Sequence, residues 1–481
     1  MAGRLIVVSN RLADFHKPAA GGLAVALSGI LRHRGGVWLG WSGKIVNRGK
    51  EDAQIIRTAV GNVEYLSIDL NEEEFNGYYK GYANATLWPI LHHRVDLAKF
   101  DKASEKIYRL MNARFAKVLL TEIQDDDVVW VHDYHLIPLG EELRAAGKLN
   151  KVGFFLHTPL PPSAILATLP NNSSLLSSLF SYDLIGFQSQ EDKRNFLNYV
   201  EWQFGKDSVE GSKVIRRGKS VVGAFPIGID VCEFQSIAQS KTAQAMRDGM
   251  REEYSKRQLV VGVDRLDYSK GIPHRVHSFG EFLHRFPQMQ RSATLIQIAS
   301  PSRGEIETYA DIQRELEALC GSVNGDLGEL DWMPVRYIHK TLCQEELAGL
   351  YQAAKVALVT PLRDGMNLVA KEFVAAQNPY KPGVLVLSRF AGVAEQMPEA
   401  LIVNPYDTES VAYAIHRALV MPLAERQERH RALLGKIKDN DLHWWCRSFL
   451  QRLTQPESES RSIKSVLKNF RARLDPNSNH A

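Results

Sequence analysis

Two cations closely follow an apolar run in the second half of the chain. Arg265 and Lys270 come shortly after Val263, and Gly271 provides a turn directly behind them. A buried strand that delivers two fixed cations to a sharp turn is typical of a site for a doubly charged anion such as a diphosphate. The sequence therefore predicts an anion site at this position.

A second apolar run leads to an acidic side chain and the start of a helix. Asp364 and Glu372 lie on this segment, and Gly365 allows close approach of the backbone. Amides near Asn367 and Leu368 would point at a phosphate with the helix dipole behind them, and Glu372 could bind ribose hydroxyls. The two segments together predict a site for a nucleotide sugar.

Polar side chains elsewhere follow apolar runs in the same way. Arg11, Asp133 and His157 each come shortly after such a run in the first half of the chain, and Arg303 does so in the second half. Ligands of open parallel sheets bind beyond the carboxyl ends of the strands. We therefore expect all four side chains at the functional edges of two sheets.

Aromatic side chains gather early in the chain, at Trp41, Tyr79 and Trp88. Singly, each is typical of a protein core. Beside polar groups, however, aromatic faces suit a sugar ring, and Arg11 and Arg303 could together hold a phosphate. This combination predicts a site for a phosphorylated sugar.

Two clusters raise the alternative of a metal site. Asp125, Asp126 and Asp127 precede their apolar run, so they should lie at the opposite edge of the sheet, and a solvated strand entry is the favoured interpretation. The histidine-rich segment 132–135 has no cysteine or glutamate motif to complete a ligand set. We predict no metal and no other cofactor.

Length and composition narrow the class of protein. A chain of 481 residues favours two domains of about 200 residues each. The net charge of +4 is small for this size and gives no argument for nucleic acid as a partner. The four cysteines form no CxxC pair, and no apolar run approaches the roughly 20 residues that cross a bilayer. We expect a cytoplasmic protein without membrane contact, and a homo-oligomer is an open alternative to a monomer.

Short apolar runs alternate with amphipathic helical patterns, which is typical of an α/β fold with parallel sheets covered on both faces. We predict a Rossmann-like domain over 1–232 and a second over 233–440. A helix over 441–455, with Trp444 and Trp445, would return to the first domain, and a polar tail would cover 456–481. The predicted strands are 5–8, 128–131, 152–156, 184–187, 221–225, 259–263, 294–298, 356–360, 384–387 and 401–403.

The motifs of the chain resemble those of the trehalose-6-phosphate synthase family of retaining GT-B glycosyltransferases. The resemblance extends from Val8 to about Leu453. The family's usual GFFLHIPFP is GFFLHTPLP here, so that Thr158 and Leu160 are substituted, and no DxDGT-type phosphatase segment follows. The matching motifs are GGLA (21–24), GWSG (40–43), LWP (87–89), WVHDYHL (130–136), GFFLHTP (153–159), PIGI (226–229), RLDYSKG (265–271), SRGE (302–305), TPLRDGMNLVAKE (360–372), VLSRFAG (386–392) and NPYD (404–407).

The resemblance implies two Rossmann-like domains that face a central cleft, with UDP-glucose as the donor. It assigns Arg265 and Lys270 to the diphosphate, and Asp364 to hydroxyls of the donor glucose. His157 would contact that glucose near the reacting carbon. The other donor contacts that it implies are Gly21 and Gly22 closing over the sugar, a backbone contact from Leu342 to the base, the amides of Leu368 and Val369, and Glu372 at the ribose.

The resemblance also implies glucose 6-phosphate as the acceptor, with trehalose 6-phosphate and UDP as products, in trehalose biosynthesis and osmoprotection. It implies front-face transfer with retention, in which the leaving diphosphate takes the proton of the acceptor hydroxyl. No carboxylate pair is assignable as acid and nucleophile in the manner of glycosidases. The acceptor residues that it assigns are Arg11, Trp41, Tyr79, Trp88, Asp133 and Arg303.

Alternatives stay open at this stage. A related synthase could use ADP-glucose or GDP-glucose, or another phosphorylated polyol such as glycerol 3-phosphate. Arg11, Gly21, Gly22 and Trp41 argue for the trehalose product, because they belong to the acceptor loop of the family. From another class, the chain could be a catalytically inactive regulatory subunit that binds sugar phosphates, and the intact set of charged donor residues argues against this.

Overall fold

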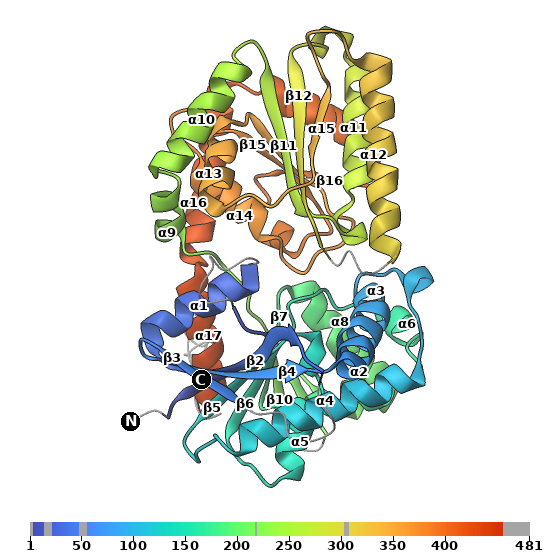
Figure 1. Ribbon diagram of the computed structural model, residues 1–481, viewed down its shortest axis with the longest axis vertical. Helices are drawn as coiled ribbons and strands as arrows, with labels where there is room; N and C mark the ends of the chain where they lie inside the picture. Colours follow the sequence, from blue (N-terminus) through green and yellow to red (C-terminus); the bar gives the residue numbers. More distant parts are fainter. Residues whose placement is uncertain (1–2, 14–21, 48–54, 217–218, 303–306, 456–481) are drawn as a thin grey trace, which may run out of the picture.

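The computed structural model describes residues 3–13, 22–47, 55–216, 219–302 and 307–455. These residues form two α/β domains, drawn one above the other in Figure 1, and each domain is built on its own β-sheet. The predicted architecture of two parallel-sheet domains is confirmed.

The first domain holds a ten-stranded sheet in the order β3-β4-β2-β1-β5-β6-β7-β10-β9-β8. The seven strands from β4 to β10 in this order run parallel, and antiparallel strands complete both edges. The strands are β1 (Leu5–Arg11), β2 (Gly36–Ile45), β3 (Ile56–Val60), β4 (Val63–Leu70), β5 (Val128–His132), β6 (Lys151–Phe155), β7 (Leu184–Phe187), β8 (Val209–Glu210), β9 (Lys213–Ile215) and β10 (Lys219–Ala224).

Helices on both faces of this sheet complete the first domain. Their bounds are α1 (Gly22–Arg34), α2 (Glu72–Glu74), the π-helix η1 (Phe75–Leu87), α3 (Trp88–Leu91), α4 (Lys102–Leu120), α5 (Leu139–Ala145), α6 (Ser163–Leu166), α7 (Asn172–Ser177) and α8 (Gln190–Phe204).

The second domain has a six-stranded, wholly parallel sheet in the order β13-β12-β11-β14-β15-β16. Its strands are β11 (Gln258–Arg265), β12 (Ala293–Ser300), β13 (Val335–Ile338), β14 (Val356–Val359), β15 (Val384–Ser388) and β16 (Leu401–Val403). Its helices are α9 (Val231–Ile237), α10 (Lys241–Glu253), the short 3-10 helix η6 (Tyr268–Lys270), α11 (Ile272–Arg285), α12 (Glu307–Leu327), α13 (Gln344–Ala353), α14 (Leu368–Ala376), α15 (Thr408–Val420) and α16 (Leu423–Asp439).

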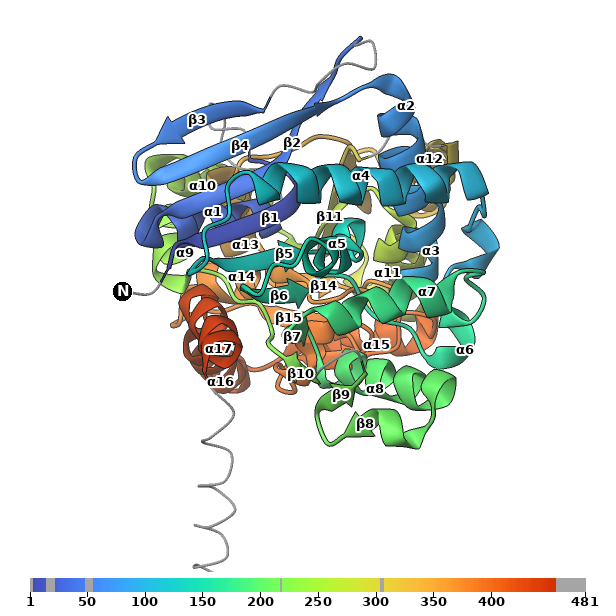
Figure 2. The same ribbon diagram turned by 90° about the horizontal axis from the view of Figure 1, so that it is seen from below.

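Alternation of side chains along β1 explains why the first sheet needs helices on both faces. Successive residues of a strand point to opposite faces. Ile6 and Val8 accordingly pack in the same apolar cluster as Phe115 of α4, whereas Leu5 and Val7 share a second cluster with Leu27 of α1. Figure 2 shows the two layers, with α1 and α17 (Leu442–Thr454) on one side of the strands and α4, α5 and α8 on the other.

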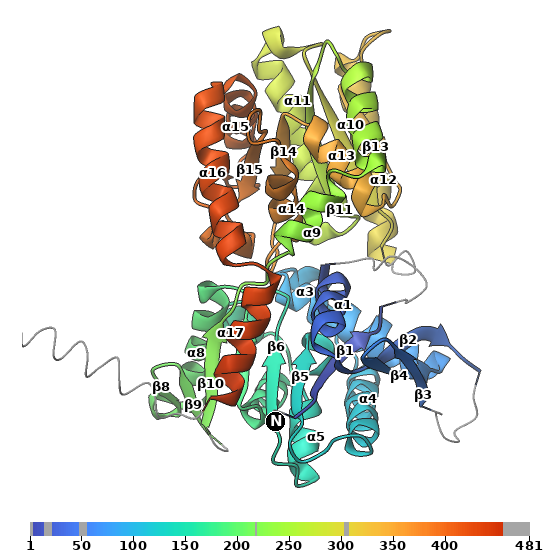
Figure 3. The same cartoon turned by 90° about the vertical axis from the view of Figure 1, so that its left-hand side faces the viewer.

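The chain crosses between the domains twice, and its second crossing ends in α17 of the first domain. Figure 3 shows α17 continuing from α16 into the first domain, beside its sheet. Trp445 is fully buried there, with its ring centroid 4.7 Å from that of Trp130 on β5. Phe449 packs against β6 and β7, where side-chain carbons at Gly153 and Gly186 would each lie 2.7 Å from its ring. The two glycines thus make room for the returning helix.

The structure departs from the expected elements in three places. The predicted boundary after residue 232 falls inside α9, which packs on α13 and α14 of the second domain. Strands β2, β3, β4, β8, β9 and β13 were not among the predicted runs. The prediction that the three aspartates are solvated was wrong for Asp127, which is 2% exposed and pairs with Arg4 at 2.8 Å. Asp125 and Asp126 are exposed, as predicted. Among the described residues, no helix is long and apolar enough to cross a membrane.

Candidate active site

The ends of β11 and β14, neighbouring strands of the second sheet, carry an ion pair. Nζ of Lys270, on η6, donates to Oδ2 of Asp364 at 2.5 Å, and Nδ2 of Asn367 donates to the same oxygen at 3.1 Å. Burial opposes ionisation of Asp364, but the Lys270 ammonium outweighs it and holds the pKa of the carboxyl below its ordinary value. A charged pair is therefore fixed where the predicted anion site lies.

A buried network under this pair was missed by the sequence analysis. Arg275 on α11 is 1% exposed, and its Nη1 donates to Oδ2 of Asp264 at 2.6 Å and to Oε1 of Gln297 at 3.1 Å. Its Nε donates to Oγ1 of Thr360 at 3.0 Å. Burial raises the pKa of Asp264, and the guanidinium opposes that rise. The network joins the ends of β11, β12 and β14, and so fixes the loops that carry Lys270 and Asp364.

Helix α14 begins directly behind Asp364. Its N-cap residue Asn367 has a φ of 76°, and its side chain accepts the N–H of Ala370 at 3.3 Å. The first-turn amides of Leu368 and Val369 thus lie at the positive end of the helix dipole, as the sequence predicts for a phosphate. Glu372 follows on the same helix, and burial raises the pKa of its carboxyl to about 7.

In the first domain, Asp133 and His157 follow the neighbouring strands β5 and β6. Asp133 has a φ of 77°, which is uncommon for a residue with a side chain, and its Oδ1 accepts the backbone N–H of His157 at 3.2 Å. The His157 ring has a partner at each nitrogen: Nε2 lies 3.1 Å from Nδ1 of His132, and Nδ1 lies 3.2 Å from Nε2 of Gln188. Burial lowers the pKa of His157 to about 3, so the ring is neutral.

Two of the predicted acceptor aromatics, Trp41 and Tyr79, pack together with Arg11. The Arg11 guanidinium lies 5.4 Å from the ring centroid of Trp41, and the Tyr79 ring lies 5.5 Å from it. Tyr79 also stacks on His135, with 6.0 Å between centroids. Trp41 is only 3% exposed, so it supports Arg11 and Tyr79 from below rather than presenting an open ring face.

Residues of the two domains meet at the carboxyl edges of the two sheets. The Arg265 guanidinium lies 5.9 Å from the ring centroid of Trp88. A side-chain carbon at Gly365 would lie 2.1 Å from the carbonyl oxygen of His157, and one at Gly22 would lie 2.6 Å from Cδ1 of Leu368. The structure thus brings predicted donor and acceptor residues together between the domains.

Two carboxylates join the domains at the start of α8. Oε1 of Glu191 accepts from Nη2 of Arg363 at 2.7 Å. The Glu395 carboxylate of the second domain accepts the backbone N–H groups of Gln190 at 2.9 Å and of Glu191 at 3.1 Å. These contacts hold the two sheet edges against each other.

Some predicted site residues do not lie among the interdomain residues described above. Gly21 and Arg303 lie outside the described residues. Leu342 lies in the loop between β13 and α13, half-buried against an apolar cluster that includes residues of both domains. Within the described residues, no group of three or more His, Cys, Asp or Glu side chains is arranged to hold a metal ion. That no cofactor is used stays a prediction.

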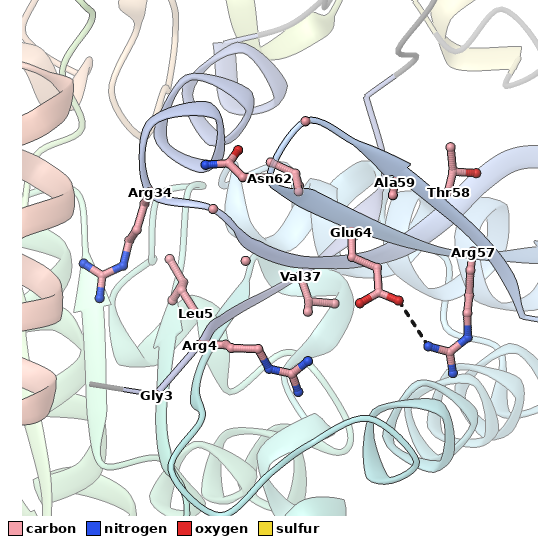
Figure 4. A pocket seen from close by; sticks show the side chains of 14 residues that line it. Gly3, Arg4, Leu5, Arg34, Val37, Arg57, Thr58, Ala59, Asn62 and Glu64 are labelled. Atoms are coloured by element: carbon pink, nitrogen blue, oxygen red, sulfur yellow. Dashed lines mark hydrogen bonds and ion pairs between the residues drawn. The ribbon is translucent and has the colours of Figure 1, made fainter. Parts of the chain in front are cut away.

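A hollow of about 970 Å³ lies away from the interdomain residues, at the amino-terminal edge of the first sheet (Figure 4). The starts of β1 and β2 and the β3–β4 hairpin line it. Two of its three arginines are paired: Arg57 lies 3.2 Å from Glu64, and Arg4 binds Asp127. The hollow therefore lies at the edge opposite the carboxyl strand ends, and none of the predicted site residues lines it.

The chain is similar to known proteins over nearly its whole length. The model of Glycosyltransferase family 20 matches residues 8–455. A trehalose-6-phosphate synthase of Sinorhizobium fredii is 44% identical over 456 residues, which cover 94% of this chain and 98% of that protein.

Two solved structures are similar to this one. A UDP-forming α,α-trehalose-phosphate synthase from Burkholderia xenovorans, in complex with glucose 6-phosphate, has a TM-score of 0.89 at 43% identity and covers 94% of this chain and 100% of that one. A protein from E. coli bound with UDP-2-fluoro glucose has a TM-score of 0.90 at 42% identity, with 94% and 99% covered.

Proposed function

The chain belongs to glycosyltransferase family 20, and on this premise we propose that it transfers glucose from UDP-glucose to glucose 6-phosphate, giving α,α-trehalose 6-phosphate and UDP. The observation that carries the proposal is the meeting of Arg265 with Trp88 and of Gly365 with His157 between the two sheets. Further support comes from relatives in complex with glucose 6-phosphate and with UDP-2-fluoro glucose.

The donor half of the proposed site lies in the second domain. Arg265 and Lys270 bind the diphosphate, together with the amides of Leu368 and Val369 at the start of α14. Glu372 accepts hydroxyls of the ribose, and Leu342 contacts the base through its backbone. Asp364, already charged beside Lys270, accepts hydroxyls of the donor glucose. Gly21 and Gly22 bind the donor, and Gly22 closes over that sugar, a role that its contact with Leu368 supports.

The acceptor half lies mainly in the first domain. Arg11 binds the phosphate with Arg303, Tyr79 and Trp88 lie beside the sugar, and Trp41 supports Arg11 and Tyr79. Asp133, whose carboxylate also accepts the backbone N–H of His157, accepts hydroxyls of the acceptor. The position of Arg11 over the Trp41 ring supports this assignment.

We propose front-face transfer with retention. Bond cleavage builds negative charge on the leaving diphosphate, where Arg265 and Lys270 stabilise it, and the diphosphate takes the proton of the acceptor hydroxyl. Asp364 is engaged with Lys270 and Asn367, which favours a role in positioning over one as a nucleophile. The protein then acts mainly by holding donor and acceptor in contact and by excluding water.

The proposal also covers the need for a metal ion and the cellular compartment. The reaction needs no metal, since the two cations of the second domain supply positive charge at the diphosphate. The protein acts in the cytoplasm, which the four unpaired cysteine thiols support, two of them exposed.

The test is a matrix of donors and acceptors with product identification. UDP-, ADP- and GDP-glucose are each combined with glucose 6-phosphate, glucose and glycerol 3-phosphate, and nucleotide release and product are measured. We expect the highest turnover with UDP-glucose and glucose 6-phosphate. Preference for another nucleotide or for glycerol 3-phosphate would favour a related synthase, and release of no nucleotide in any combination would favour a regulatory subunit.

A further inference from the structure

The Ile227 peptide, in the crossover from β10 to α9, is held from both sides by buried side chains. Its N–H donates to Oε1 of Gln188 at 2.9 Å, and its carbonyl accepts from Nζ of Lys371 at 2.7 Å. Gln188 follows β7 in the first domain and is 2% exposed, and Lys371 lies on α14 in the second and is 0% exposed. Side chains of both domains therefore converge on one peptide of the crossover.

This contact fixes the orientation of the Gln188 amide. A backbone N–H can only donate, so the atom that faces Ile227 must be the oxygen of the amide. The other end of the amide is then the NH₂ group, which can only donate, and it lies 3.2 Å from Nδ1 of His157. Nδ1 of His157 must therefore accept, and it carries no proton.

The same logic continues along the chain of contacts. A neutral imidazole carries one proton, so that of His157 is on Nε2, and it is donated to Nδ1 of His132 at 3.1 Å. His132 is 0% exposed, and its own proton is then on Nε2 among the rings of Trp130 and Trp445. One backbone N–H thus determines the tautomers of two histidines.

We propose that Gln188 is a positioning residue of the site, which ties the His157 ring to the domain crossover and keeps it a neutral imidazole with its proton on Nε2. Both ring nitrogens of His157 are engaged, so it neither gives a proton to the substrates nor takes one from them. Lys371 acts one step further away, because it holds the Ile227 peptide in place. The consequence for catalysis rests on the proposed function, whereas the tautomer does not.

The surroundings of His157 favour the neutral ring. The titratable groups that face it are His132 on β5 and Asp133 after that strand, whose carboxylate is bound to the His157 backbone. Helix α17 presents the uncharged Trp445, 5.8 Å away between centroids, and the second domain presents the backbone of Gly365. Burial lowers the pKa of His157 far enough that it does not titrate near neutral pH.

The test is nitrogen NMR of the histidine rings in the full chain, without substrates, between pH 5 and 9. The His157 signals are assigned by their loss in His157→Asn. In the wild type we expect an unprotonated Nδ1, a protonated Nε2 and no titration. In Gln188→Glu the carboxylate can only accept, so the proton moves to Nδ1 and the ring titrates within this range. A protonated Nδ1 in the wild type, or unchanged signals in Gln188→Glu, would overturn the proposal.

Gln377 offers a matched control. It is another buried glutamine that bridges a backbone N–H, of Gly383 at 2.7 Å, and a carbonyl, of Tyr351 at 2.6 Å. Gln377→Glu should leave the His157 signals unchanged. Gln188→Leu, which removes the orienting donor, should lower kcat about 10-fold with little change in KM. Normal turnover in a folded Gln188→Leu protein would contradict the positioning role. Absence of the proposed activity in the wild type would leave the ring signals, and hence the tautomer, unaffected.

Discussion

Lys270 and Asp364, which follow two neighbouring strands of the second sheet, form an ion pair with 2.5 Å between Nζ and Oδ2. Their side chains are 12% and 13% exposed, so the pair is partly shielded from water yet open to a ligand. The Lys270 ammonium holds the pKa of Asp364 below its ordinary value before any substrate binds.

Replacement of Lys270 tests the role of this pair. Lys270→Ala should lower turnover by about 100-fold or more, the scale of one lost preorganised charge contact. Asp364 also loses the cation that holds its pKa down, so its pKa should rise. Lys436→Ala is the matched control, because it removes a lysine–glutamate pair with Glu399, at 2.7 Å, outside the site. Steady-state kinetics on both variants measure the effect, and near-normal turnover in Lys270→Ala would count against the diphosphate assignment.

Glu372 should make the free protein less stable as the pH rises. Burial raises the pKa of its carboxyl to about 7 in the folded state, against 4.5 as its ordinary value. Between these values the unfolded chain loses the proton and the folded chain keeps it, so stability falls through this window. Glu372→Gln should therefore gain up to about 3 kcal/mol over the wild type between pH 4.5 and pH 8.

Glu399→Gln is the matched control for Glu372→Gln, and its effect on stability should depend on pH in the opposite direction. Lys436 holds the pKa of Glu399 below its ordinary value, so the ionised form of Glu399 stabilises the fold and the benefit is lost as the pH falls. Glu399→Gln should consequently lose stability at pH 8 relative to acidic pH. Urea unfolding of the ligand-free proteins at several pH values measures both effects. If Glu372→Gln changed the free energy of unfolding by the same amount at every pH, the proposed titration of Glu372 would be wrong.

Glu395 should favour the closed arrangement of the two domains. Its carboxylate accepts two backbone N–H groups at the start of α8, and contacts of a charged group are worth about 1.5–3 kcal/mol. Glu395→Ala should shift the equilibrium towards an open form and raise KM for both substrates by roughly 10- to 100-fold. Small-angle scattering should show a larger radius of gyration without substrates and compaction when UDP and glucose 6-phosphate are added. Glu425→Ala is the control, because it breaks an ion pair with Arg429 on α16, at 2.8 Å, away from the interdomain contact. Identical scattering and KM in the wild type and both variants would show that Glu395 does not favour the closed arrangement.

Activity should survive exhaustive chelation, because Arg265 and Lys270 supply the positive charge at the diphosphate. The measurement is turnover in EDTA, followed by addition of magnesium or manganese. Loss of activity in EDTA that a divalent ion restores would show that the cations of the protein do not suffice.

Much of the fold follows from local patterns. In the apolar run Val128–Val131, for example, all residues except the half-buried Val128 are fully buried, which marks a central parallel strand. Strands at or near the sheet edges lack this signal: all of β3 except Thr58 is exposed, and β13 carries the exposed Arg336. Asp127 looked solvated because its partner Arg4 is far away in the sequence, and only the pairing of β1 with β5 brings the two together.

Part of the candidate site could likewise be predicted from the sequence, and part could not. Lys270 and Asp364 could be found because each follows an apolar run and ligands gather at the carboxyl ends of strands. Their ion pair could not be predicted, since it depends on β11 and β14 being neighbours in the sheet. Gln188 and Arg275 carry no local signature: a glutamine after a strand and an arginine on an amphipathic helix are normally solvated, and their burial appears only in the assembled fold.

Transfer of glucose from UDP-glucose to glucose 6-phosphate can be tested directly by following the reacting carbon. UDP-glucose labelled with ¹³C at C1 is mixed with glucose 6-phosphate and the protein, and ¹³C NMR and UDP release are recorded together. We expect the label at the α-anomeric carbon of α,α-trehalose 6-phosphate, in amounts equal to the UDP released. Label in a β-linked product, in free glucose or in no product at all would contradict it.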